Sequence, residues 1–298
     1  MNVSRREFLR TSAAGAAAAA NSLAAFGRYS IGVVGPASDF EKSVRYGFDY
    51  HEAPVWELAH MSEAEFSDFK QRVLGSPLRC RRCNMFTAPA GKPGMRVVGP
   101  EVDTAAARAY VEKALARCRE LGAEIVVWGS ARSRNVPEGF PRERAWGQIA
   151  DFLRMVEPIA RAQNITIGIE PLSVPESNIL NTGGEVLKMQ RELNLPRIKM
   201  IIDYYHLAVM KEDPEILCTA HDQIIHLHFA NPHGRVWPRD PAEDPGYSPF
   251  FQLVKKSSYR GGISIEGKGT YEESAVAALA FFQTELAGIN SHVPTSPR

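Results

Sequence analysis

Four side chains that can bind a metal or carry a proton stand at the ends of four consecutive apolar segments. They are Glu170, Asp203, His228 and Glu266. One charged residue in such a place is usually a cap or half of an ion pair. Four in succession need another reason, because a buried carboxylate costs free energy unless it is paired or holds a cation. Oxygen ligands with one imidazole suit Mn²⁺, Mg²⁺ or Co²⁺, with Zn²⁺ as a further option.

Carboxylates beside a divalent cation can move a proton that lies next to a carbonyl group. The cation polarises the carbonyl oxygen and stabilises an enediolate, while a carboxylate takes the carbon-bound proton. Return of a proton from the opposite face inverts the carbon, and return to the neighbouring carbon exchanges aldose and ketose. Loss of a leaving group would instead make the enzyme a lyase. The residues alone leave these three outcomes open.

The elements that must position these side chains alternate between short apolar runs and longer helical patterns. The runs cover residues 29–35, 48–55, 79–87, 125–130, 166–172, 199–206, 224–231 and 261–268. Several are nearly continuous in Ile and Val, as is typical of parallel strands that are covered on both faces.

Helix signals lie between the runs. Ser62 and Glu65 have capping-box spacing, and Gly122 follows a helical stripe of apolar residues as its left-handed stop. Eight strands in strict β-then-α order predict the α/β class and a (β/α)8 TIM barrel formed by one catalytic domain, residues 28–298. No Gly-rich turn follows the first strand, which disfavours a dinucleotide-binding fold. Active sites of such barrels form at the carboxyl ends of the strands, where the four side chains stand.

Two further patterns involve histidine and cysteine pairs. His226 and His228 share one face of a strand, and His228, nearer the carboxyl end, is the better ligand, which leaves His226 to the core or to a supporting role. Cys80 and Cys83 have CxxC spacing, but positions three apart in a strand point to opposite faces, so no redox role is expected.

Taken together, the motifs resemble the xylose isomerase-like barrels of the sugar phosphate isomerase/epimerase family. The closest branch is that of the ketose 3-epimerases of the D-tagatose/D-psicose type. The pieces that carry the resemblance are Ile-Glu170-Pro-Leu, Asp203-x-x-His206, His226-x-His228, Arg235, Ser264-Ile-Glu266, the segment from Gly47 to Glu52 and Trp128-Gly-Ser-Ala-Arg132.

This resemblance implies roles for named residues. One divalent ion, most often Mn²⁺, would be held by Glu170, Asp203, His228 and Glu266, and the two glutamates would form the acid-base pair. His206 and Arg235 would hold substrate oxygens, and Glu52 is a further candidate for substrate contact. The implied reaction is C3 epimerisation of a ketose, with a small-molecule sugar as partner and a homodimer or homotetramer as the assembly. A polar loop after Arg235, residues 236–244, is expected to cover the site.

Residues 1–27 differ in composition from the rest. The paired Arg5 and Arg6, followed by an Ala- and Gly-rich stretch, resemble a twin-arginine export signal. We therefore expect removal of residues 1–27, a periplasmic or otherwise exported enzyme, and no membrane contact after cleavage. Without them the chain has 32 basic and 33 acidic residues, a balance that does not suggest a nucleic-acid partner.

Three rivals share part of this pattern. A metal-dependent lyase or dehydratase acting on a 3-keto sugar, a 3-keto-glycoside or an inosose would use the same residues. A nuclease of the AP-endonuclease type would need many histidines at the strand ends, and the whole chain has 8. A non-catalytic sugar-binding protein would have no need of an acid-base pair.

Overall fold

The eight apolar runs form the eight strands of one closed parallel barrel, as predicted. The computed structural model describes residues 29–87 and 95–287. The strands are β1 (Ser30–Val34), β2 (Tyr50–Pro54), β3 (Arg79–Asn84), β4 (Ile125–Trp128), β5 (Thr166–Ile169), β6 (Ile198–Asp203), β7 (Ile224–Phe229) and β8 (Gly262–Ile265). This is a single-domain (β/α)8 TIM barrel.

Strand pairing follows chain order all the way round. Each strand pairs in parallel with its successor, and β1 closes the ring on β8, with Ser30 opposite Gly262 and Val33 opposite Ile265. Because all eight strands run the same way, their carboxyl ends open at one mouth. Residues from the ends of β5 to β8 are therefore brought to the same side of the barrel.

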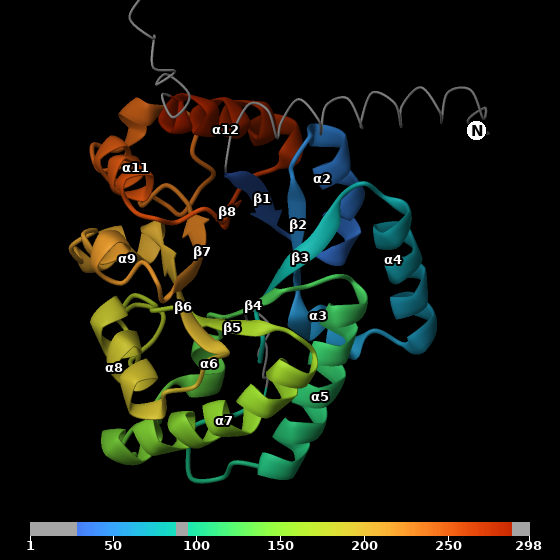
Figure 1. Ribbon diagram of the computed structural model, residues 1–298, viewed down its shortest axis with the longest axis vertical. Coiled ribbons are helices and arrows are strands. Elements are labelled where there is room, and N and C mark those ends of the chain that lie inside the picture. Colours follow the sequence, from blue (N-terminus) through green and yellow to red (C-terminus); the bar gives the residue numbers. More distant parts are fainter. Residues whose placement is uncertain (1–28, 88–94, 288–298) are drawn as a thin grey trace, which may run out of the picture.

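Helices surround the barrel (Figure 1). They are η1 (Ala37–Asp39), α2 (Phe40–Tyr46), α3 (Val55–His60), α4 (Glu63–Gly75), α5 (Thr104–Glu120), α6 (Ala131–Arg134), α7 (Arg142–Ala162), α8 (Gly183–Leu193), α9 (Tyr204–Met210), α10 (Ile216–Thr219), η2 (Pro241–Glu243), α11 (Tyr247–Lys256) and α12 (Tyr271–Leu286). In the part of the chain that the structure describes, no helix is long and apolar enough to span a membrane. The predicted export signal lies outside the described residues.

Two predicted helix ends are confirmed. The hydroxyl of Ser62 caps α4 by accepting from the Glu65 amide, while the Glu65 carboxylate accepts from the Ser62 amide. Just beyond α5, Gly122 adopts φ +88°, a left-handed conformation that costs glycine little.

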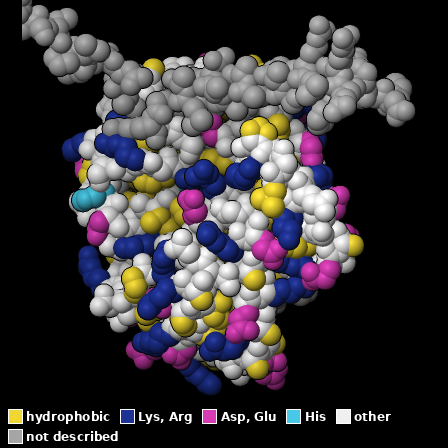
Figure 2. Space-filling model, turned by 45° about the vertical axis from the view of Figure 1, so that its right-hand side comes forward, with side chains coloured by type: hydrophobic (Ala, Val, Ile, Leu, Met, Phe, Trp, Pro, Cys, Tyr) yellow, Lys and Arg dark blue, Asp and Glu magenta, His cyan; other side chains and the backbone are white. Residues whose placement is uncertain are grey.

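Charged side chains of both signs are scattered over the face drawn in Figure 2.

The third strand departs from simple alternation. Tyr50 pairs with Arg79 and Glu52 with Arg82, so β3 carries one residue more than β2 over this stretch, which is a β-bulge. Cys80 and Cys83 are consequently both buried, and the thiols of both interact with Cys118. The expectation that these two cysteines point to opposite faces was wrong, because the bulge shifts the alternation by one residue.

Part of the barrel interior is polar. The ring of Tyr50 lies inside, where a Cβ on Gly32 would come within 2.1 Å of it, so β1 needs glycine at that position. The hydroxyl of Tyr50 bonds the hydroxyl of Ser264, and both residues are buried. A barrel interior is ordinarily filled with branched apolar side chains, so this polar filling needs an explanation.

A candidate metal centre at the carboxyl ends of the strands

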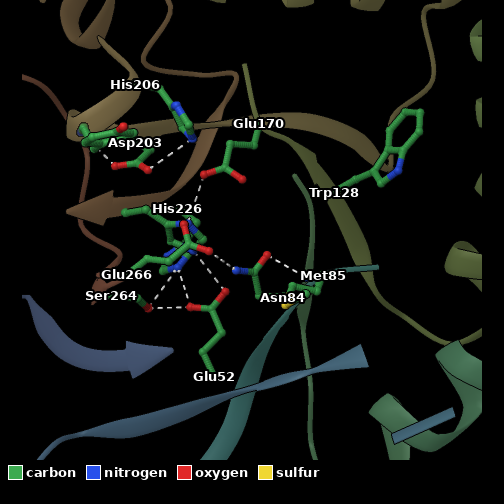
Figure 3. Close-up of polar contacts among 12 residues, drawn as sticks. Glu52, Asn84, Met85, Trp128, Glu170, Asp203, His206, His226, Ser264 and Glu266 are labelled. Carbon is green, nitrogen blue, oxygen red and sulfur yellow. Dashed lines mark hydrogen bonds and ion pairs between the residues drawn. The ribbon is translucent and has the colours of Figure 1, made fainter. Parts of the chain in front are cut away.

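The four predicted ligands meet at the mouth of the barrel, and Figure 3 labels Glu170, Asp203 and Glu266 among them. Glu170 directly follows β5, Asp203 ends β6, His228 lies in β7 and Glu266 directly follows β8. One potential ligand atom from each lies within 4.8 Å of the others. Their convergence is a consequence of the closed barrel, since these four strands are neighbours in it.

His228 occupies the middle of this group. Its Nδ1 lies 3.1 Å from Glu170 Oε1 and 3.1 Å from Glu266 Oε2, and its ring has no exposed surface. Burial disfavours a charged imidazole, but the carboxylates of Glu52, Glu266 and Glu170 outweigh burial and raise the pKa of His228 well above its usual value.

The three carboxylates of the group differ in their surroundings. Burial, and then the charge of Glu266, raise the pKa of Glu170. Burial also raises the pKa of Asp203, to about 7, although the charge of Arg235 acts in the opposite direction. For Glu266 burial is outweighed by the charges of Arg235 and His228, which lower its pKa far below the usual range.

The chemistry of these donors fits a divalent cation. Glu170, Asp203 and Glu266 carry three negative charges when ionised, and Arg235 supplies one positive charge at hydrogen-bond distance from Glu266. The remaining excess is what a divalent ion neutralises, and buried carboxylates so close together repel one another without one. Oxygen donors with a single imidazole nitrogen suit a hard divalent cation.

Residues next to β4 hold Glu170 in place. Gly129 follows β4, and a Cβ there would lie 1.8 Å from Glu170 Oε2, so the carboxylate occupies the space that glycine leaves open. The guanidinium of Arg134, also buried, donates to the backbone carbonyls of Trp128 and Glu170 and so ties β4 to β5. Gly129, the second residue of the Trp128-Gly129 pair, thus leaves the space in which the Glu170 carboxylate lies.

His206 presents one ring nitrogen to the site. It lies in the first turn of α9, because β6 ends at Asp203 and does not continue to 206 as expected. Its Nδ1 accepts from the amide of Ser173 at 3.1 Å, so in the neutral ring Nε2 carries the proton. Nε2 has no hydrogen-bond partner among the described residues. Burial, and then Arg235, lower the pKa of His206 to about 3, which leaves a neutral ring with a free N–H donor.

Arg235 joins the loop after β7 to the metal centre. Its Nη1 donates to Glu176 Oε1 at 2.7 Å and its Nη2 to Glu266 Oε2 at 2.9 Å, while its guanidinium lies over the ring of Tyr205 at 4.8 Å. The backbone of Arg235 is left-handed, with φ 53°, a strained conformation that is often found at functional sites.

Glu52, the further candidate for substrate contact, is enclosed by other side chains, and its contact with substrate stays a prediction. Its side chain has no exposed surface. One carboxylate oxygen bonds His228 Nε2 at 3.1 Å and the other bonds His226 Nε2 at 3.0 Å and accepts from the Ser264 hydroxyl. Glu52 therefore lies beneath the metal centre, on the side away from the mouth, where its oxygens are already occupied.

Two residues of the site were not predicted from the sequence. Asn84, the last residue of β3, donates from Nδ2 to Glu266 Oε1 at 2.7 Å. Glu176, in the segment after β5, pairs with Arg235. A polar residue that ends an apolar strand was a usable signal for Asn84. Nothing in the spacing around Glu176 distinguishes it from an ordinary loop residue.

Comparison with known proteins agrees with the geometry. Residues 40–285 match the family of xylose isomerase-like TIM barrels. The chain belongs to this family. It is 26% identical over 184 residues to the 3-dehydro-D-guloside 4-epimerase of Escherichia coli (strain K12), covering 58% of this chain and 69% of that enzyme. It is also 27% identical over 126 residues to the L-ribulose 3-epimerase of Methylomonas sp. (strain DH-1), covering 42% of this chain and only 43% of that enzyme.

Solved structures of the family give the same fold. A structure of L-ribulose 3-epimerase has a TM-score of 0.74 at 18% identity, covering 90% of this chain and 100% of that one. A 3-keto-D-glucoside 4-epimerase from E. coli has a TM-score of 0.69 at 19% identity, covering 88% and 98%. At such identities the likeness establishes the barrel and no more.

Proposed function

We propose that this chain is a divalent-metal-dependent sugar epimerase that inverts a carbon next to a ketone. The reaction that we favour is inversion at C3 of a ketose. The observation that carries the proposal is the pair of glutamates, Glu170 and Glu266, which converge on His228 Nδ1 from different strands. Two carboxylates facing one small space are suited to take a proton from one face of a carbon and return one to the other.

The names of the relatives support this reaction class. A 3-epimerase acting on a ketose and a 4-epimerase acting on a 3-dehydro sugar both invert a carbon adjacent to a carbonyl. That shared feature suggests two substrate classes for this chain, free ketoses and 3-keto-glycosides. Isomerase chemistry in the broad sense follows from either of them.

The chain's own residues have separate tasks in this proposal. Glu170, Asp203, His228 and Glu266 would hold the ion, which supplies Lewis-acid polarisation of the substrate carbonyl. One glutamate removes the proton from the carbon next to the ketone, which leaves an enediolate, and the other delivers a proton to the opposite face. His206 Nε2–H and the Arg235 guanidinium donate hydrogen bonds to the oxygen that gains negative charge.

A metal-depletion experiment tests the proposal. The chain is freed of metal with a chelator, then incubated with ketopentoses, ketohexoses and 3-keto-glycosides, with and without Mn²⁺, Mg²⁺, Co²⁺ or Zn²⁺. We expect the C3 epimer of at least one ketose, seen by NMR, and only after an ion, preferably Mn²⁺, is added back. An unsaturated product would assign the same site to a lyase, and turnover that survives chelation would contradict the metal requirement.

A further inference from the structure

A second group of buried polar side chains lies directly beneath the candidate metal centre. Glu52, His226 and Ser264 have no exposed surface, and Tyr50 is 1% exposed. Figure 3 shows Glu52 and Ser264 on the side of the site away from His206. A buried carboxylate in a barrel interior is costly, so its partners should show what it does.

The contacts of these side chains form one continuous series of hydrogen bonds. Tyr50 bonds the Ser264 hydroxyl at 2.8 Å, and Ser264 donates to Glu52 Oε2. Glu52 Oε1 in turn lies 3.1 Å from Nε2 of His228, whose other ring nitrogen faces Glu170. This series of hydrogen bonds ends at His228, the one imidazole of the metal centre.

The direction of the last bond determines which nitrogen of His228 is free. An ionised carboxylate only accepts hydrogen bonds, so Nε2 must carry the proton that it shares with Glu52. In the neutral ring Nδ1 then keeps its lone pair, and Nδ1 is the atom that lies 3.1 Å from both Glu170 and Glu266. A carboxylate behind a ligating histidine fixes the tautomer and ring orientation of that histidine and raises its basicity.

We infer that Glu52 is a positioning residue that fixes His228 with Nδ1 as the metal-binding atom, without itself touching substrate or metal. The inference rests on the metal site of the proposed function. It also explains the polar interior of the barrel, because Ser264 and His226 hold the second oxygen of Glu52 and so set the plane of its carboxylate.

A second metal ion is the rival explanation. Glu52, His226 and His228 also place ligand atoms within 4.8 Å of one another. However, this cluster has one carboxylate against two imidazoles, so it lacks the excess negative charge of the metal centre, and the hydroxyl of Ser264 already donates to Glu52 Oε2. We therefore assign this cluster to hydrogen bonding, and expect one ion per chain.

Metal titration of the full-length chain tests the inference. Wild type, Glu52→Gln and the control Glu212→Gln are freed of metal and titrated with Mn²⁺ by calorimetry. Glu212 is a matched control because its carboxylate also accepts hydrogen bonds, from the Gly183 amide at the start of α8, and it belongs to neither group of potential ligands. We expect one ion per wild-type chain, an affinity loss of about 10- to 100-fold in Glu52→Gln, and no change in Glu212→Gln.

A spectroscopic measurement on the wild type keeps the test independent of whether the variant folds. In the Zn²⁺-loaded chain, ¹⁵N NMR of His228 should show a protonated Nε2 and a metal-bound Nδ1. Binding through Nε2, two ions per chain, or unchanged affinity in a folded Glu52→Gln would each overturn the inference. A wild type that binds no divalent ion would instead refute the proposed function, so the two failures can be told apart.

Discussion

Gly129→Ala is the substitution for which the structure predicts most about the site. Gly129 has no catalytic group of its own. Among the described residues, the three atoms nearest to an added Cβ all belong to Glu170, with Oε2 at 1.8 Å and Cδ at 3.0 Å. The change therefore alters where Glu170 lies and leaves the chemistry of every side chain in the metal centre intact.

The displacement follows from this contact. Cβ atoms essentially never approach another atom closer than 3.0 Å, so Glu170 Oε2 must move by about 1.2 Å. A misplacement of about 1 Å in an active site can cost on the order of 100-fold in rate. That factor corresponds to about 2.7 kcal/mol of transition-state stabilisation. We expect kcat/KM to fall by about this factor and metal affinity to fall with it, because Glu170 is also a proposed ligand.

The assay compares Gly129→Ala with Gly147→Ala. Gly147 lies inside α7 with nothing within 4 Å of an added Cβ, so alanine there should preserve activity and stabilise the helix by about 1 kcal/mol. Steady-state kinetics, Mn²⁺ affinity and thermal unfolding are measured for both. If folded Gly129→Ala keeps wild-type kcat/KM and Mn²⁺ affinity, the assigned position of Glu170 is not needed for function.

Three further predictions concern charge, pH and targeting. Arg235→Lys keeps the positive charge but loses the forked guanidinium that bridges the carboxylates of Glu176 and Glu266. In steady-state assays kcat/KM should therefore fall about 10- to 100-fold. Wild-type kinetics in this variant would show that the bridge is not needed. Since burial raises the pKa of Asp203 to about 7 in the metal-free chain, an ion must displace a proton below that pH. Because the pKa of His228 is raised as well, its imidazolium must also lose a proton before Nδ1 can bind an ion. Mn²⁺ affinity should therefore rise as pH increases from 5 to 8, and calorimetry in buffers of different ionisation enthalpy should detect proton release at pH 6; a flat profile would contradict this. Finally, we propose that residues 1–27 direct export, so replacing Arg5 and Arg6 with Lys should retain a reporter fusion in the cytoplasm, and unchanged export would reject a twin-arginine signal.

Much of the barrel could be predicted because its physical basis is local. Strands covered on both faces appear in the sequence as apolar runs, and a closed parallel ring then forces their carboxyl ends together. Glu170 and Glu266 could thus be expected to meet although 95 residues separate them. The helix that begins at Tyr204 was harder to foresee, since large side chains continue past Asp203, the residue whose carboxylate caps this helix.

The parts that could not be predicted depend on register and on loop conformation. Whether Glu52 faces substrate or His228 depends on its depth in the barrel, and the β-bulge in the neighbouring strand is not visible in residue types. Glu176 reaches Arg235 only through the path of the segment after β5. Each of these is a long-range contact with no periodic signal of its own.

Solvent deuterium exchange tests the central claim most directly. The Mn²⁺-loaded wild type, Glu170→Gln and Glu266→Gln are incubated in D₂O with a ketose that the wild type converts, and the label is located by NMR. The account predicts deuterium at C3 of the epimerised ketose with wild type, and loss of epimerisation in both variants at Mn²⁺ concentrations that saturate them. Epimer formed without label at that carbon, or wild-type turnover in either variant, would contradict it.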